Sequence, residues 1–492
     1  MKLSFSNKTF EQLDANLIII PFRDGGKNRA YRYLDKKTNN ALETVAAQEV
    51  FKGQKDRNLI WQGQVFEKDL KIILVGCGAG REPDDFRCAV GRGIRYAYAH
   101  RIDKVFIVID SRDFGQAEIP AAWSAEAVLM SDYRFMAYKS STRKSNHPKE
   151  VQIGFYPLAE ETAKISKAFR KGKARAQGVI LARDLVNEPA NILSPDEIAA
   201  RAKTLAKQKG LNIKVLDERG IRQKKMNLLL SVAAGSVRPP RFIHLTYHPK
   251  GKPTAKIALV GKGVMFDSGG LCIKPGKSMY EMKTDMAGGA AVLGIMSALK
   301  SLDVTAEVHG IIPATDNAID GNATRPGDVF TAMSGKTVEI LNTDAEGRLI
   351  LADALAYAST LKPDIMIDMA TLTGACEVAL GSFTAGLFAK EDKDAAELLK
   401  AAISAGERLW RLPLAGELES SIRSDIADIK NIGGRFGGAI TAALFLKHFT
   451  KDLPWAHLDI AGPARLDKGT PICVKGGSGY GVLTTLAYLE NK

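Results

Sequence analysis

The sequence predicts an α/β protein with two domains: a smaller N-terminal α/β domain, a connecting helix, and a larger C-terminal α/β domain with a mixed, mostly parallel sheet. The chain has 492 residues, more than a single hydrophobic core usually organises. Short apolar runs alternate with stretches of helical periodicity along the chain, a pattern typical of a sheet covered by helices. The composition changes at Asn187-Glu188-Pro189, where loop and helix-cap signals open a second region.

The N-terminal domain is expected over residues 1–160. The segments around 84–99 and 124–136 predict helices between apolar strands. A glycine-rich run at 76–80 follows one strand, but Arg81 stands where a dinucleotide-binding loop needs a glycine, so we expect a tight turn instead. The predicted strands cover residues 16–22, 71–76, 104–110 and 151–156.

The connecting helix is expected over residues 161–186, a basic, alanine-containing stretch with helical periodicity and no proline. The second domain is expected over residues 187–492. Its strands are short and largely apolar, which predicts a sheet covered on both faces. They cover residues 212–216, 242–247, 256–260, 306–312, 364–369 and 384–388.

Composition favours a protein of the cytoplasm. Hydrophobic residues make up 45% and charged residues 25%, which is ordinary for a globular chain. No apolar run approaches the roughly 18 residues that a membrane helix needs, and the N-terminus lacks the order of a signal peptide. The five cysteines are odd in number and widely spaced, which predicts reduced thiols rather than disulfides or a zinc knuckle.

The formal net charge is +14, and most of the excess lies in the first third of the chain. Residues 1–180 hold 31 lysines and arginines against 21 acidic residues, whereas residues 181–492 hold 38 against 34. A basic domain is able to bind nucleic acid. The alternative is simply a well-charged surface, because no zinc-finger, RNA-binding or heptad pattern accompanies the charge.

The densest chemical motif is the run NTDAEGRL at residues 342–349, which precedes an apolar helix. In an extended segment, alternate side chains point to one side. We therefore expect Asp344, Glu346 and Arg348 to converge, with the carboxylates available to a metal and the arginine to an anion.

A second group of polar residues follows the strand at 256–260. The run GKGVMFDSGG at residues 261–270 is not a phosphate-binding loop, because no serine or threonine directly follows its lysine. Lys262, Asp267, Lys274 and Asp285 lie on loops next to this strand end, where open α/β sheets usually bind ligands.

Together the two groups hold four carboxylates, two lysines and one arginine. Four carboxylates at one site repel one another unless cations hold them. Two divalent ions would neutralise them, and such pairs drive hydrolysis by activating water. Oxygen-rich ligands favour Mn²⁺, Mg²⁺ or Zn²⁺. Each residue alone would more simply be a surface charge or a helix cap.

These motifs resemble the leucyl aminopeptidase family of dinuclear metallo-aminopeptidases, for which NTDAEGRL is a signature. The resemblance covers residues 180–492 and implies a catalytic C-terminal domain behind a macrodomain-like N-terminal domain. It also implies peptide substrates, a cytoplasmic homohexamer built as a dimer of trimers, and, as in some bacterial relatives, DNA binding. Further matching runs are ATLTGA at 370–375, GGRFGGAITAA at 433–443 and WAHLDIAG at 455–462.

The resemblance implies a ligand set for two divalent ions, either Mn²⁺ or Zn²⁺. Asp267 and Glu346 would bridge the two ions. Lys262 and Asp285 would complete the tighter site, and Asp344 the more exchangeable one. A lysine ligand has to be neutral, so the metal must displace a proton from a group with a free pKa of about 10.4.

The resemblance also implies catalytic and substrate-binding residues. Lys274 would stabilise the oxyanion of the tetrahedral intermediate, and Arg348 would hold a bicarbonate that relays protons. Met282, Thr371 and Gly374 would line the pocket for the first side chain of the peptide, which suits leucine-like residues.

The sequence departs from the family pattern at two places. Residues 316–321 read DNAIDG where the family often has ENMPSG, which we expect to alter substrate preference without touching the metal ligands. Leu483 stands where relatives tend to carry an arginine.

Overall fold

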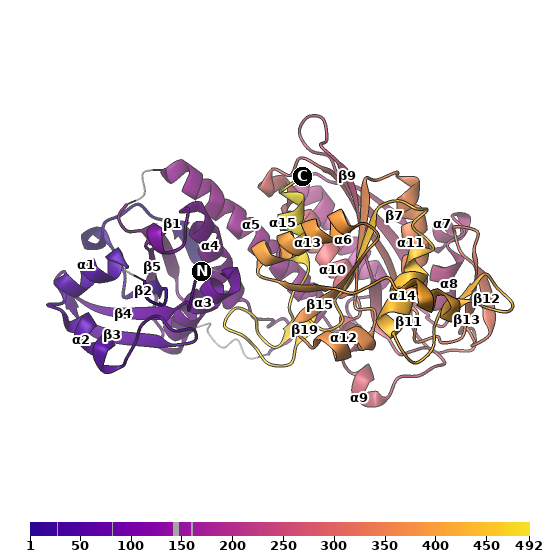
Figure 1. Cartoon of the computed structure of the whole chain (residues 1–492), viewed down its shortest axis with the longest axis horizontal. Helices are drawn as coiled ribbons and strands as arrows, with labels where there is room; N and C mark the ends of the chain where they lie inside the picture. The colour runs from indigo at the N-terminus through magenta and orange to yellow at the C-terminus, as the bar shows by residue number, and fades with distance from the viewer. Residues whose placement is uncertain (27, 81, 141–146, 159–160) are drawn as a thin grey trace. The chain divides into compact units, whose positions relative to one another are not determined.

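The protein forms two units, each with its own α/β sheet (Figure 1). The computed structural model describes residues 1–26, 28–80, 82–140, 147–158 and 161–492. One unit contains Met1–Gln177 and Lys468–Lys475, and the other contains Gly178–Asp467 and Gly476–Lys492. Helix α5 (Thr162–Asn187) continues from the first unit into the second along the chain. The predicted two-domain α/β fold is confirmed.

The N-terminal unit contains a six-stranded sheet in the order β1-β6-β5-β2-β4-β3. All neighbouring strands are parallel except β3, which pairs antiparallel with β4. The strands are β1 (Lys2–Phe5), β2 (Leu17–Phe22), β3 (Asn58–Val65), β4 (Lys68–Gly76), β5 (Lys104–Ile109) and β6 (Glu150–Phe155).

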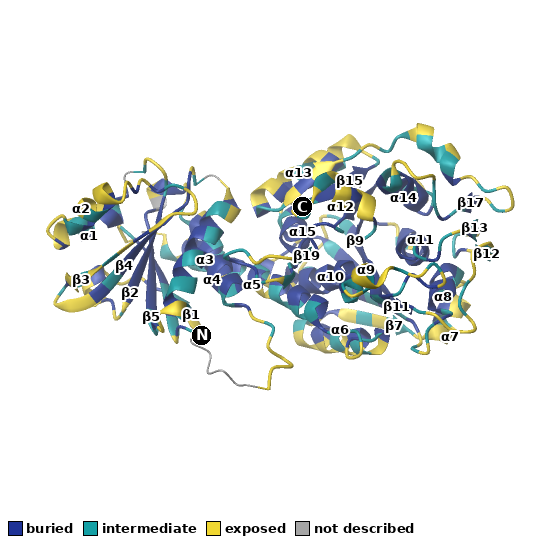
Figure 2. Ribbon diagram, turned by 90° about the horizontal axis from the view of Figure 1, so that it is seen from below, coloured by how far each residue is buried: buried dark blue, intermediate teal, exposed yellow. Residues whose placement is uncertain are grey.

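Alternating side chains of β2 show that this sheet is covered on both faces. Leu17 and Ile19 belong to a core with α3 and α4, whereas Ile18 and Ile20 belong to a core with α1 and α2. In Figure 2 the strands of this sheet are largely buried. The helices are α1 (Arg29–Lys37), α2 (Ala41–Gln48), α3 (Pro83–Ala99) and α4 (Glu118–Asp132), and the short 3₁₀ turns are η1 (Phe10–Gln12) and η2 (Ser111–Asp113).

All four predicted strands of this unit are present, together with both predicted helices. The run after β4 forms a turn in which Gly78 and Gly80 have positive φ angles, as expected. Arg81 lies outside the described residues.

The second unit contains a nine-stranded mixed sheet in the order β16-β15-β18-β14-β9-β11-β8-β7, with β10 paired to β11. Five of its strand pairs are parallel and three are antiparallel, so the expected mostly parallel arrangement is confirmed. The strands are β7 (Asn212–Leu216), β8 (Arg241–Tyr247), β9 (Lys256–Gly261), β10 (Gly263–Asp267), β11 (Glu307–Asn317), β14 (Ile365–Ala370), β15 (Thr384–Ala389), β16 (Arg408–Arg411) and β18 (Trp455–Asp459).

Helices cover this sheet as well. Ala258 and Val260 of β9 pack in one core with α8 (Asn227–Ala233), α11 (Gly347–Thr360) and α14 (Gly438–Lys447). The alternate side chains of β9 face the other way, and α10 (Ala287–Ala298) also contacts β9, β11 and β14. The other helices are α6 (Pro195–Lys209), α7 (Glu218–Gln223), α9 (Gly276–Met279), α12 (Gly374–Leu380), α13 (Asp392–Ala405) and α15 (Val482–Leu489).

Two small sheets and three 3₁₀ turns complete this unit. The first small sheet joins β13 (Thr337–Ile340) to β17 (Ile429–Lys430), just ahead of the loop that leads into α11. The remaining elements are β12 (Asp328–Thr331), β19 (Arg465–Leu466), β20 (Gly476–Gly477), η3 (Met282–Thr284), η4 (Leu299–Leu302) and η5 (Gly416–Ile422). The carboxyl ends of β9, β10, β11 and β14 carry the loops that form the site described next.

Candidate functional site

The expected site residues lie where central strands end and helices begin. Lys262 separates β9 from β10, and its backbone N–H donates to the carbonyl oxygen of Met369 at 3.0 Å. Asp267 is the last residue of β10, and Asp285 directly follows η3. The carboxyl ends of neighbouring parallel strands meet at one edge of the sheet, so these side chains are brought together.

The expectation of an extended segment at residues 344–348 is wrong. Thr343 and Asp344 form a turn, Glu346 has helical backbone angles (φ −79°, ψ −35°), and Arg348 already lies in the first turn of α11. The turn still brings Asp344 and Glu346 together, because it folds the segment back on itself. Arg348 is directed instead toward Asn431, whose carbonyl oxygen accepts a hydrogen bond from Arg348 Nη1 at 2.8 Å.

Lys262 joins two of the four carboxylates. Its ammonium group lies 2.7 Å from Asp285 Oδ2 and 2.8 Å from Glu346 Oε1, and it donates to the carbonyl oxygen of Thr371 at 3.0 Å. Burial acts to lower the pKa of Lys262, but Asp285, Glu346 and Asp267 outweigh burial and raise that pKa above its usual value. Without a metal, Lys262 is therefore a buried cation.

Lys274 joins the other two carboxylates. Its ammonium group lies 2.9 Å from Asp267 Oδ2 and 2.5 Å from Asp344 Oδ1. As for Lys262, neighbouring carboxylates raise its pKa against the effect of burial. The two lysines thus pair with all four carboxylates but offset only two of the four negative charges.

The carboxylates fit a metal centre. Asp267, Asp344 and Glu346 each offer an oxygen, and the three oxygens all lie within 4.8 Å of one another. Oxygen donors at such spacing suit divalent ions such as Mn²⁺, Mg²⁺ and Zn²⁺. Burial and the Glu346 charge raise the pKa of Asp267 to about 7, which shows how poorly a second negative charge is tolerated there without further cations.

Burial dominates the pKa values of the other acidic residues as well. It raises the pKa of Asp285 and, less strongly, that of Asp344. Glu346 is the exception, because Lys262 and Lys274 together outweigh burial and lower its pKa. Glu346 therefore keeps its negative charge at the centre of the cluster.

Arg348 is buried beside this cluster. Burial lowers the pKa of its guanidinium group to about 10, so the group stays charged at neutral pH. Its Nε is buried and has no hydrogen-bond partner among the described residues. A buried N–H that lacks an acceptor fits a small anion at this position.

Glycine is required where the two halves of the cluster touch. A Cβ atom on Gly347 would lie 2.5 Å from Lys262 Cε and 2.6 Å from its Nζ. Gly269 has a φ angle of +88°, and a Cβ atom there would lie 2.8 Å from Asp344 Oδ1. Larger residues at either position would displace a lysine or a carboxylate of the site.

The residues expected to line a substrate pocket lie on neighbouring loops. The Thr371 hydroxyl donates to Asp285 Oδ1 at 2.7 Å, which connects its loop directly to the acidic cluster. Met282 begins η3, which leads to Asp285. Gly374 begins α12, and a Cβ atom there would meet no described atom within 4 Å, so space is open beside it.

Two buried residues that support the site were not anticipated. The Asn431 side chain accepts from the N–H groups of Leu341 and Asn342 at 2.9 and 3.3 Å, and donates to the Asn342 carbonyl oxygen at 2.7 Å. Asp459 Oδ2 accepts from the Thr373 hydroxyl at 2.7 Å. Asp459 lies in the run WAHLDIAG, which offered a signal, whereas the sequence around Asn431 offered none.

The two departures from the family pattern fall in different places. Residues 316–321 begin at the end of β11, where Asn317 contacts the acidic cluster, and continue into an exposed loop. Leu483 lies buried in α15, and nothing in the described chain gives its presence a consequence.

Two further expectations concern the whole chain. All five cysteines are free thiols, as the sequence predicts. Among the described residues, no helix is both long enough and apolar enough to cross a membrane.

Comparisons with known proteins find relatives that match both units of the chain. Residues 180–486 match the model of the cytosol aminopeptidase family, catalytic domain, and residues 19–142 match the model of its N-terminal domain. A probable cytosol aminopeptidase of Aquifex aeolicus is 46% identical over 93% of this chain and 92% of its own length. Another, from a Synechococcus strain, is 42% identical over 99% of this chain and 98% of its own length.

Solved structures are similar over almost the whole chain. A mutant of tomato leucine aminopeptidase has a TM-score of 0.90 at 35% identity, covering 100% of this chain and 97% of its own. The bottromycin maturation enzyme BotP, in complex with Mn, has a TM-score of 0.84 at 34% identity. The match covers 97% of this chain and 99% of the BotP chain.

Proposed function

Because the chain belongs to the cytosol aminopeptidase family and is a metal-dependent aminopeptidase, we propose that it releases N-terminal amino acids from peptides by two-metal activation of a water molecule. The observation that carries this proposal is the convergence of Asp267, Asp344 and Glu346, with Lys262 and Asp285 beside them.

The proposed ligands divide between two divalent ions, either Mn²⁺ or Zn²⁺. Asp267 and Glu346 would help to hold both ions, with Lys262 and Asp285 for one of them and Asp344 for the other. The Mn in the BotP structure supports manganese as one candidate. When bound, the ions would polarise the scissile carbonyl group and lower the pKa of water so that it attacks at neutral pH.

The chain's own residues would supply the remaining chemistry. Lys274 stays cationic and stabilises the negative charge that develops on the carbonyl oxygen of the peptide. Asp285 helps to hold the α-amino group of the substrate, which would restrict cleavage to the N-terminal residue. Arg348 would hold a bicarbonate, which would supply a proton relay for the leaving amine, and the unpartnered buried Nε of Arg348 supports anion binding there.

For the substrate we propose a broad preference led by leucine. Met282, Thr371 and Gly374 would receive the first side chain, and the open space at Gly374 supports room for a branched aliphatic group. The physiological role would be the turnover of peptides in the cytoplasm, and the free cysteines agree with such a reducing compartment.

We further propose a homohexamer, a dimer of trimers, on the basis of family resemblance. Light scattering of the purified protein would test it, since a monomer of 53.2 kDa and a hexamer differ sixfold in mass.

A second function, DNA binding by the basic first third of the chain, is compatible with peptidase activity. The excess of lysine and arginine over residues 1–180 favours it. A mobility-shift assay with duplex DNA at increasing salt would test this role, because affinity that depends on phosphate contacts falls steeply with salt. Absence of a shift at low salt would remove the proposal.

The leading proposal is tested by metal analysis combined with a substrate panel. Elemental analysis of the purified protein should find about two divalent ions per chain. Amino-acid amides tested with Mn²⁺ and with Zn²⁺ should be cleaved fastest for leucine-like residues, and N-acetylated amides should resist cleavage. Cleavage of N-acetylated substrates would contradict the assignment of an aminopeptidase.

A further inference from the structure

Asn317, the last residue of β11, contacts both halves of the acidic cluster. Its side-chain Nδ2 donates to Asp267 Oδ1 at 2.8 Å and to the backbone carbonyl oxygen of Thr343 at 3.0 Å. Asp267 ends β10, whereas Thr343 directly precedes Asp344. We propose that Asn317 is a positioning residue that fixes Asp267 against the Asp344 turn and selects which Asp267 oxygen is presented to the metals.

The contacts of Asp267 show how the selection would work. Oδ1 accepts two hydrogen bonds, from Asn317 Nδ2 and from the backbone N–H of Gly269, each at 2.8 Å. Oδ2 instead faces the ammonium group of Lys274 at 2.9 Å. The two N–H donors occupy Oδ1, so Oδ2 is the oxygen left for a cation. Hydrogen bonds that orient a ligand in this way usually matter for metal affinity.

The orientation of the Asn317 amide is set by its partners. Both atoms near Nδ2 are acceptors, a carboxylate oxygen and a carbonyl oxygen, so a turned amide would place its own oxygen against two others. The Thr343 side chain adds a second connection, because its hydroxyl donates to the Gly269 carbonyl oxygen at 2.7 Å and accepts from the Cys272 N–H at 2.8 Å. Asn317 and Thr343 therefore both connect the segment after β10 to the turn at Asp344 through hydrogen bonds.

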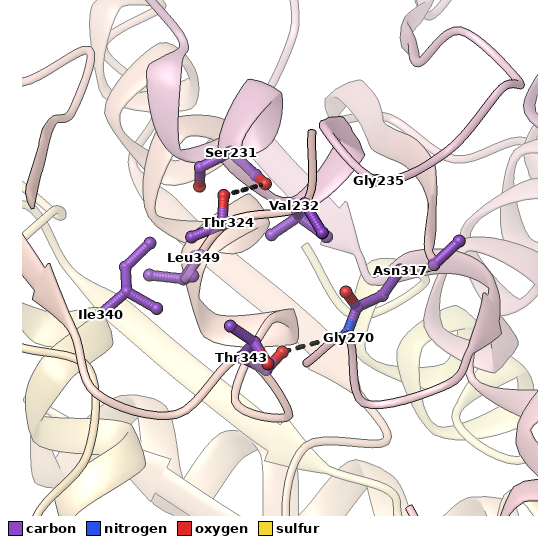
Figure 3. A pocket seen from close by; sticks show the side chains of 11 residues that line it. Ser231, Val232, Gly235, Gly270, Asn317, Thr324, Ile340, Thr343 and Leu349 are labelled. Carbon is purple, nitrogen blue, oxygen red and sulfur yellow. Dashed lines mark hydrogen bonds between the residues drawn. The ribbon is translucent and has the colours of Figure 1, made fainter. Parts of the chain in front are cut away.

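A small cavity lies beside Asn317 and Thr343. Asn317, Gly270 and Thr343 line one side of it, and Ile340 and Leu349 lie across from them (Figure 3). The cavity measures about 10 Å³, which is room for about one water molecule. A Cβ atom on Gly270 would lie 3.0 Å from Asn317 Oδ1, so glycine is needed for this close packing.

The inference rests on the proposed metal centre, and it is tested by metal affinity as well as by activity. Asn317→Asp keeps the shape but replaces the N–H donors with an acceptor, and Asn317→Ala removes the amide without adding charge. Asn322→Asp, in the exposed loop nearby, makes the same charge change away from the cluster. Metal-free proteins would be titrated with Mn²⁺ against a chromophoric chelator, and their thermal midpoints would be measured separately.

Both Asn317 variants should bind Mn²⁺ about 10- to 100-fold more weakly, whereas Asn322→Asp should match the wild type. A role in folding alone would lower the thermal midpoint and leave the affinity of the folded protein unchanged, and that result would overturn the inference. A wild-type protein that binds no Mn²⁺ would overturn the proposed function as well.

A crystal structure of the wild-type protein with Mn²⁺ decides the matter even if both variants fail to fold. The inference requires Asn317 Nδ2 within hydrogen-bond distance of Asp267 Oδ1 and the metals on Oδ2. Metal bound to Oδ1, with the Asn317 amide turned away, would refute it.

Discussion

At the scale of single residues, two lysines carry much of the electrostatic balance of the site. Lys262 pairs with Asp285 and Glu346, and Lys274 with Asp267 and Asp344. Opposite charges at such distances in a buried region interact strongly, so the pairs offset part of the cost of removing the charges from water. The same two lysines have different expected roles, one as a ligand and one as a cation that faces the substrate.

Replacing Lys274 should impair chemistry more than substrate binding. We expect Lys274→Ala to lower kcat about 10²- to 10³-fold, because it removes a cation that stabilises charge in the transition state. Steady-state kinetics on leucine amide would measure the change. Lys277→Ala, three residues away on α9 and exposed, is the matched control. A loss confined to KM would argue against the role given to Lys274.

A single methyl group at Gly347 should disturb the metal centre. The added Cβ would press on Lys262, so we expect Gly347→Ala to weaken Mn²⁺ binding about 10- to 100-fold. Alanine is the better helix former, so lost helix propensity could not explain such a result. Gly416→Ala, where no described atom lies within 4 Å of the added Cβ, serves as the control. Metal titration would show whether the two variants differ.

At the scale of elements, β8 and β11 carry a chain of hydrogen-bonded histidines away from the acidic cluster. His244 Nε2 lies 2.9 Å from His309 Nδ1, and His244 Nδ1 lies 3.0 Å from the Tyr357 hydroxyl. His309 Nε2 lies 3.0 Å from Glu307, at the start of β11. Burial and the nearby His309 lower the pKa of His244 to about 4.

This shift predicts that protonation of His244 in acid destabilises the second unit. The folded-state pKa of His244 lies below the unfolded value of 6.5, so the unfolded chain takes up the proton first. The contribution of His244 to stability is full above about pH 6.5 and falls as the pH drops toward about 4, by at most about 3 kcal/mol. Urea unfolding across this pH range would measure the loss.

Two variants isolate the contribution of His244. We expect a smaller acid-dependent loss in His244→Gln than in the wild type, and no such difference in His100→Gln, which replaces an exposed histidine of the other unit. Equal pH dependence in wild type and His244→Gln would show that other groups cause the loss.

The elements also show what the sequence predicts and what it does not. Every predicted strand forms, because buried apolar runs have few alternatives to a central strand. The apolar pattern is too weak to predict β3, in which exposed residues alternate, or β17, which has two residues. The turn at Asp344 was missed because spacing alone does not distinguish an extended segment from a turn.

Supporting residues are harder to predict than ligands. Carboxylates and lysines beside glycine-rich loops predict the cluster. Asn431 contacts the 342–345 turn only in the folded chain, because it is distant from that turn in sequence. The packing of Lys468–Lys475 with the N-terminal unit is likewise invisible in the sequence, because no local pattern marks it.

At the scale of the whole molecule, metal should act on stability as a ligand rather than as a requirement for folding. The carboxylates of the cluster already have cationic partners in Lys262 and Lys274. We expect chelation to abolish activity while the circular dichroism spectrum stays unchanged. The thermal midpoint should rise again with added Mn²⁺, as mass action requires. Unfolding on chelation would contradict this view of the metal-free state.

The central claim is that the acidic cluster holds the metals that perform hydrolysis, and Glu346→Ala tests it most directly. Glu218→Ala is the control, because Glu218 is exposed and forms a surface ion pair with Arg222. Metal content and leucine amide hydrolysis would be measured for both variants in buffer with excess Mn²⁺. We predict a folded Glu346→Ala protein that binds less metal and has no measurable activity, while Glu218→Ala matches the wild type. Wild-type activity in Glu346→Ala would contradict the account.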